Sequence, residues 1–279
     1  MSSFKHPKCY ASALGGCSKT VTAEHFVSRS VLEFLCDGFD VEFKGFPWQE
    51  GDRARCPSPA SLTGKMLCSR HNSDLHSLDD EALALFHAFD RVHKTMLDDT
   101  RSGASEIRIK GELFERRVLK AAFGFMASGN CRRREGLPRK MHPPLPMLEV
   151  LFGLRPMPQP FGLFLAGPPG EHPMGRTHVS LQSFFDKNGP NAAVPNLVAV
   201  GCDVDQFRFR LALCQLPSDR TGTPFENALY HPHHLSFVHS GRPCKVKVLL
   251  DWKDSPHGGY GFDVHFAPTD KPSAFPALN

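Results

Sequence analysis

The stretch "LCSRHNSDLH", residues 67–76, concentrates residue types that bind metal ions. Cys68 and His71 are separated by two residues, so a tight turn between them lets both side chains reach one ion. Upstream, Cys9 and Cys17 flank the segment "ASALGG", in which the two glycines favour a turn. Three thiols and an imidazole form the ligand set of a closed tetrahedral site. These four residues therefore predict a structural zinc ion.

A second interpretation is that the cysteines are small buried residues and His71 is a surface histidine. We give that interpretation to the six other cysteines, which are spread along the chain: Cys36, Cys56, Cys131, Cys202, Cys214 and Cys244. Nine cysteines is an odd number, and with this spread a full disulfide framework is not expected.

The segment "TAEHFVSRS", residues 22–30, adds a carboxylate and an imidazole. If residues after Cys68 start a helix, Asn72 and His76 lie one turn apart on the same face. With Glu24 they would form an open site suited to Mg²⁺, Mn²⁺ or a catalytic Zn²⁺. His25 would remain free to act as a general base. Alternatively, Asn72 caps the helix and His76 is an exposed helical residue.

This order of residues, with paired cysteines, Glu-His, Cys-x2-His-Asn and a later histidine, resembles the HNH, or ββα-metal, nucleases over residues 9–80. The resemblance implies that Glu24, Asn72 and His76 bind a catalytic ion and that His25 activates water. It also implies that the structural zinc is held by Cys9, Cys17, Cys68 and His71.

The chain departs from the family at the residue that orients the catalytic imidazole. The family usually has Asn nine positions before the first helical ligand, where this sequence has Thr63. The loop between His25 and Thr63 is also long. Its segment "RSVLEFLCDGFDVEFKG" predicts a short helix and a strand.

The formal net charge is only +4, so the chain as a whole is not strongly basic, but positive charge is clustered in parts of it. Arg29 follows the expected first strand, and "CRRREGLPRK" contains further cations that could contact phosphates: Arg132, Arg133, Arg134, Arg139 and Lys140. A solvated charged loop explains the same run. The sequence has no apolar run long enough to cross a membrane and no signal-peptide core, so we expect a cytoplasmic protein without a membrane partner.

The 279 residues predict an α+β chain in three parts. Residues 1–80 form the ββα-metal unit, and residues 81–145 form a helical segment with amphipathic helices at 79–97 and 112–128. Residues 137–161 are rich in proline and predict a connection. Residues 146–279 form a β-rich subdomain, in which alternating patterns at 196–216, 244–252 and 259–268 predict strands and "SPHGG" a turn.

The first functional hypothesis is a metal-dependent endonuclease acting on DNA, with RNA as the other candidate substrate. The second is a catalytically degenerate, zinc-stabilised module that binds nucleic acid or another partner. A third gives the C-terminal subdomain a role in docking a protein partner or a second copy of the chain. The histidines of "YHPHHLSFVH", residues 230–239, are explained by a proline-bearing loop that enters a strand.

Overall fold

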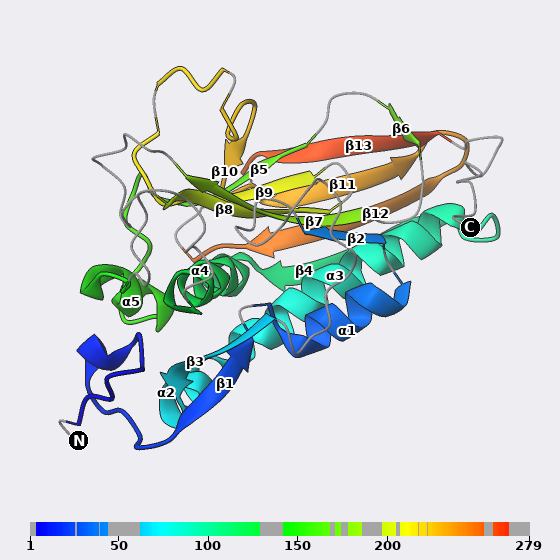
Figure 1. Ribbon diagram of the computed structural model, residues 1–279. Coiled ribbons are helices and arrows are strands. Elements are labelled where there is room, and N and C mark those ends of the chain that lie inside the picture. The colour runs from blue at the N-terminus through cyan, green and yellow to red at the C-terminus, as the bar shows by residue number, and fades with distance from the viewer. Residues whose placement is uncertain are drawn as a thin grey trace, which may run out of the picture.

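The computed structural model shows a mixed α+β protein in which helices lie against extended sheets (Figure 1). It describes residues 4–25, 27–38, 40–43, 62–128, 142–167, 171–173, 178–185, 197–204, 207–216, 218–221, 223–253 and 259–267.

The N-terminal part is a two-stranded unit followed by helices, at the lower left of Figure 1. Strand β1 (Val21–His25) pairs antiparallel with β3 (Thr63–Cys68), and the chain continues into α2 (Ser69–Asp74) and α3 (His76–Leu97). A single 3-10 turn, η1 (Ser12–Leu14), precedes β1. The expected helix and strand between the paired strands are confirmed as α1 (Arg29–Gly38) and β2 (Asp40–Phe43). The strand pair is therefore followed directly by a helix, and α1 and β2 lie between its two strands in the chain.

The first large sheet joins the N-terminal part to the C-terminal half. Its order is β10-β5-β9-β8-β7-β2, and β2 lies at one edge, parallel to β7. The remaining strands are β5 (Gly162–Ala166), β7 (His178–Phe185), β8 (Leu197–Val204), β9 (Phe207–Ala212) and β10 (Leu229–Tyr230). The predicted strands within 196–216 are thus confirmed as β8 and β9.

The second large sheet has the order β4-β12-β11-β13-β6. Its strands are β4 (Gly103–Lys110), β6 (Glu171–Pro173), β11 (His234–His239), β12 (Cys244–Asp251) and β13 (Gly261–Ala267). The strands expected at 244–252 and 259–268 are present, but β11 lies between them and pairs antiparallel with β12 and parallel with β13. The turn expected at "SPHGG" lies largely outside the described residues, and β12 and β13 are not neighbours in the sheet. Strand β4 also differs from the prediction, because its residues belong to the segment 81–145 that was expected to be helical.

The helices pack on the sheets to form a large hydrophobic core, and a second, smaller cluster lies around Phe164 and Phe225. Helix α4 (Gly111–Ser128) contacts α3, α5, β3 and both large sheets, and it buries Phe114, Leu119 and Phe123. Helix α5 (Leu145–Leu151) begins after Pro144, within the segment expected to be only a connection. Proline is well tolerated there because the first turn of a helix does not need its N–H.

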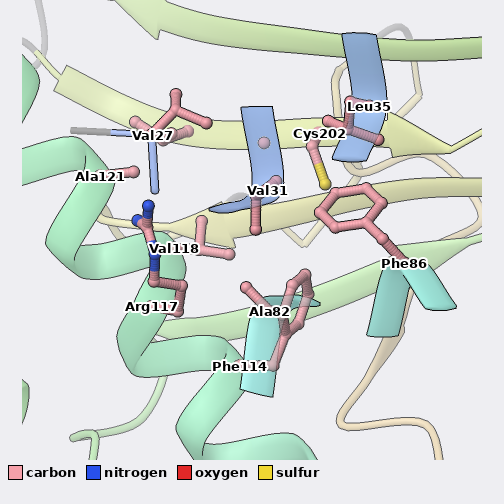
Figure 2. A pocket seen from close by; sticks show the side chains of 12 residues that line it. Val27, Val31, Leu35, Ala82, Phe86, Phe114, Arg117, Val118, Ala121 and Cys202 are labelled. Atoms are coloured by element: carbon pink, nitrogen blue, oxygen red, sulfur yellow. The ribbon is translucent and has the colours of Figure 1, made fainter. Parts of the chain in front are cut away.

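Between α1, α3, α4 and β8 lies an apolar cavity of ≈ 60 Å³ (Figure 2). Val31, Phe86 and Phe114 line it, with the Cys202 thiol on the sheet side. It is smaller than an apolar cavity that holds benzene, about 150 Å³. Burial raises the pKa of Cys202 to about 12, so this thiol is not a reactive nucleophile. We interpret this space as a packing defect rather than as a ligand site.

Candidate metal centre and the adjoining charged cluster

Four predicted zinc ligands meet at the base of the strand pair. Cys9 and Cys17 lie on either side of η1, Cys68 ends β3, and His71 lies in α2. All four side chains are buried, and their ligand atoms lie within 4.8 Å of one another. The short turn from Cys68 to His71 brings that pair together locally, whereas the pairing of β1 with β3 brings the two upstream cysteines to it.

The spacing of these atoms fits a tetrahedral ion. His71 Nδ1 lies 3.3 Å from Cys9 Sγ, 3.8 Å from Cys17 Sγ and 3.3 Å from Cys68 Sγ. Zinc bonds of about 2.3 Å to sulfur and 2.0–2.1 Å to nitrogen place these atoms about 3.6 Å apart in a tetrahedron. The cluster can therefore hold a metal ion such as zinc, as the sequence predicted.

Without a bound ion, burial disfavours the charged forms of the buried ligands in this cluster. Burial lowers the pKa of His71, which keeps its imidazole neutral, and Phe152 packs edge-on at 5.3 Å. Burial raises the pKa of Cys9 to about 12. Burial also acts to raise the pKa of Cys68, but hydrogen bonds from His71 and Ser18 outweigh it and the net pKa is lowered. A bound cation would stabilise all three buried thiolates.

The other cysteines divide into two groups. Cys202 and Cys244 are buried free thiols and Cys214 is a half-buried one, in line with a packing role. Cys36 is exposed and disulfide-bonded, so its interpretation as a small buried residue is wrong. Cys56 and Cys131 lie outside the described residues.

Glu24, a predicted ligand of the second ion, takes part in a buried ion cluster. Its carboxylate lies 2.7 Å from Lys120 Nζ, which also donates a hydrogen bond of 2.8 Å to Asp79. Arg117 Nε approaches the same Asp79 at 2.7 Å. Glu24 is 6% exposed and Lys120 is 1% exposed. A divalent cation on Glu24 would lie next to this buried ammonium, and the repulsion would be strong at low dielectric.

Asn72 and His76 are engaged elsewhere. Asn72 Nδ2 donates to Thr22 Oγ1 at 3.2 Å. The His76 side chain is 77% exposed, and its Nδ1 lies 3.8 Å from Asp80. The interpretation of His76 as an exposed helical residue describes this arrangement. Within the described residues, the cysteine cluster is the one group of three or more metal-binding side chains. The residues proposed for a catalytic ion therefore do not fit it as arranged.

His25 and Thr63 do lie together, directly opposite each other in the β1–β3 register. This is the relation expected of a base and its orienting residue. Burial lowers the pKa of His25, so the imidazole is neutral near pH 7 and able to accept a proton. Arg29 is exposed and forms a 2.7 Å ion pair with Glu33. The basic run Arg132, Arg133, Arg134, Arg139 and Lys140 lies outside the described residues.

Lys120 is the residue of this site that the sequence analysis missed. It stands three positions before Phe123 in α4, so it lies near the buried face of that helix. A lysine at such a position needs a carboxylate partner, and Glu24 and Asp79 supply two.

No described helix has the length and apolar character that a membrane span requires. Comparisons with protein-family models, with curated proteins and with solved structures found no match for this chain.

Proposed function

We propose that the protein is a zinc-stabilised nucleic-acid-binding protein, in which the unit formed by residues 4–25 and 62–74, with β1, β3 and α2, contacts phosphates. The observation that carries this proposal is the excess of unpaired, exposed positive charge around the candidate zinc site. The ligand cluster would fix the loops that present these charges, because the four ligands come from both sides of η1, from β3 and from α2.

The charge balance of this unit is one-sided. Residues 4–25 and 62–74 contain five lysines and arginines and two carboxylates, a net charge of 5 − 2 = +3, against a formal +4 for the whole chain. One carboxylate is Glu24, which is buried against Lys120, and the other is Asp74. The cations are all exposed: Lys5, Lys8, Lys19, Lys65 and Arg70. Of these, Arg70 alone has a carboxylate partner within the described chain, Asp74 at 4.0 Å.

Exposed lysines without carboxylate partners suit phosphate contacts that do not depend on base sequence. Each phosphate that they neutralise releases condensed counterions, so affinity falls as salt increases. We expect binding to a labelled DNA duplex, followed by fluorescence anisotropy, to weaken steeply between about 50 and 200 mM salt.

Lys19→Gln and Lys65→Gln should each weaken binding and make the salt dependence shallower by about one counterion. Lys245→Gln is the matched control, because Lys245 is an exposed lysine on β12, outside this unit. Equal losses in all three variants, or binding that salt does not weaken, would contradict the proposal.

Phosphodiester cleavage is the second candidate function, favoured by the position of His25. The imidazole lies at the end of β1 opposite Thr63, and its lowered pKa leaves it neutral. In that role His25 would take the proton from an attacking water molecule. The engagement of Glu24 by Lys120 counts against this candidate, because it occupies the carboxylate that a catalytic ion would need.

A plasmid-nicking assay with Mg²⁺, Mn²⁺, Ni²⁺ and Zn²⁺ in turn separates the two candidates. DNA binding with no nicking in any of the four metals supports the proposal of a nucleic-acid-binding protein. Nicking that is abolished in His25→Ala, with the zinc content and melting temperature of that variant unchanged, supports cleavage.

A further inference from the structure

A cleft of ≈ 430 Å³ lies where the start of α4 meets the segment after α5. None of its lining residues belongs to the β1–β3 strand pair. Tyr230, His231 and Trp252 supply one wall, and Leu154 and Met157 line another part. This volume lies in the range of small-molecule sites, about 300–1,000 Å³. The cleft therefore has room for an organic ligand, unlike the apolar cavity below β8.

The cleft contains one guanidinium that forms no ion pair within the described chain. Its lining includes three lysine and arginine side chains and two glutamates, and Glu149 beside it adds a third carboxylate, so the charges balance at 3 − 3 = 0 before His231 is counted. Lys253 pairs with Glu112 at 3.1 Å, and Arg155 pairs with Glu149 at 3.2 Å. Within the described chain Arg116 forms no ion pair, although the Glu112 carboxylate interacts with it electrostatically, and its one hydrogen bond is from Nε to the Leu151 carbonyl at 2.8 Å. Its terminal nitrogens remain available to an anion.

The burial of Arg116 makes this charge effective. Burial lowers the pKa of its guanidinium, which nevertheless stays charged at neutral pH. A half-buried cation is screened less by salt than an exposed one. The Nε hydrogen bond also fixes the guanidinium plane, so an oxyanion could receive two parallel N–H donors from it.

The aromatic wall of the cleft is held by ring stacking and by a hydrogen bond. The His231 ring is stacked between Tyr230 and Trp252, with ring centres 3.9 Å away on each side. His231 Nε2 and Glu115 Oε2 lie 2.7 Å apart, and the same oxygen accepts a hydrogen bond from Leu163 N at 2.7 Å. His231 has a φ of 44°, a left-handed conformation that is costly for this residue type. Such strain is commonly retained where a site has to be held in place.

From the unpaired guanidinium and the apolar wall we infer that this cleft binds a small organic oxyanion, a phosphate or carboxylate carried on a planar apolar group. The anion would contact Arg116, and the apolar group would lie against Met157 and the exposed edges of the aromatic stack. The ordering of His231 by Glu115 keeps the wall in position before the ligand arrives, which reduces the entropic cost of binding.

Isothermal titration calorimetry of the full chain with four probes tests this inference. Phenyl phosphate and benzoate carry both features, inorganic phosphate carries the anion alone, and benzyl alcohol carries the ring alone. We expect saturable binding of phenyl phosphate or benzoate, at least about tenfold tighter than that of either partial probe. Whichever of the two binds more tightly identifies the anion. Failure of both to bind would overturn the inference.

Two sets of variants locate the site. Arg116→Gln should weaken binding about tenfold or more, whereas Arg91→Gln, at an exposed arginine of α3 that does not line the cleft, should leave it unchanged. Leu154 is 69% exposed, so a charged residue is tolerated there even if Arg116→Gln misfolds. Leu154→Glu should weaken binding and Leu154→Lys should not. Equal affinities in the Leu154 pair would place any binding elsewhere and contradict the assignment.

Discussion

Two buried polar clusters lie beside the β1–β3 strand pair, and they differ in whether the cluster itself contains a cation. The cysteine and histidine cluster gathers Cys9, Cys17, Cys68 and His71 without any cation among its members. The ion cluster gathers Glu24 and Asp79 around Lys120, so it carries its own cation. Only the first cluster could take a cation from solution. The comparison teaches that a carboxylate at a ligand position is not a metal site when a buried ammonium already neutralises it.

Loss of the metal should have the largest effect. Structural zinc contributes about 10–16 kcal/mol in small zinc-dependent peptides, although here a continuous core supports part of the fold. Cys68→Ser should abolish stoichiometric zinc, measured by mass spectrometry, and expose amides of residues 4–25 and 62–75 to rapid hydrogen exchange. Cys214→Ser, at a thiol outside the cluster, should keep the zinc. Full zinc content in Cys68→Ser would remove the metal site from this comparison.

Breaking the ion cluster should have the second largest effect. Lys120→Met leaves two carboxylates near Arg117 without their buried ammonium, and we expect a loss of about 3–5 kcal/mol in the free energy of unfolding. The double variant Glu24→Gln/Lys120→Met should lose less, because it removes both members of one pair. Urea denaturation at neutral pH measures both. A loss below about 1 kcal/mol in Lys120→Met would show that the lysine is not the cation of this cluster.

A half-buried histidine outside both clusters should have a smaller, pH-dependent effect. Burial lowers the pKa of His93 below its ordinary value of 6.5, while Asp90 acts to raise it and Lys94 to lower it. The unfolded chain therefore binds this proton more tightly, so the stability contribution is complete above pH 6.5 and is lost as pH falls through the lowered folded-state pKa.

His93→Gln should consequently make the fall in unfolding free energy shallower when the pH is lowered from about 7.5 to about 5.5, with zinc in excess. His76→Gln, at an exposed histidine, serves as the control. Identical slopes in wild type and His93→Gln would mean that His93 does not contribute to acid sensitivity.

An exposed ion pair should have the smallest effect. Lys94 and Asp90 lie 2.7 Å apart on α3, with the lysine side chain 74% exposed. Water screens this pair, so Lys94→Ala should cost only about 0.3–0.5 kcal/mol in thermal or urea denaturation. A loss of stability similar to that of Lys120→Met would mean that burial does not explain the difference between the exposed Lys94–Asp90 pair and the buried ion pairs of Lys120.

Local spacing in the sequence by itself determined several turns, helices and strands of this protein. The two-residue separation in "CSRH", the helical periodicity of residues 79–97 and 112–128, and the alternation around Phe207 and Phe209 act over a few residues, and the structure confirms each of them. Such patterns are readable because the backbone geometry of a turn, helix or strand fixes which nearby side chains share a face.

The tertiary structure decided which segments far apart in the chain contact each other. It placed Lys120 against Glu24, inserted β11 between β12 and β13, drew β4 into a sheet, and set Glu115 beside His231. Each of these contacts joins residues far apart in the chain, and each depends on how whole elements pack to bury their apolar faces. The sequence could therefore name Glu24 as a candidate ligand, but only the packing of α4 supplied the ammonium that it faces.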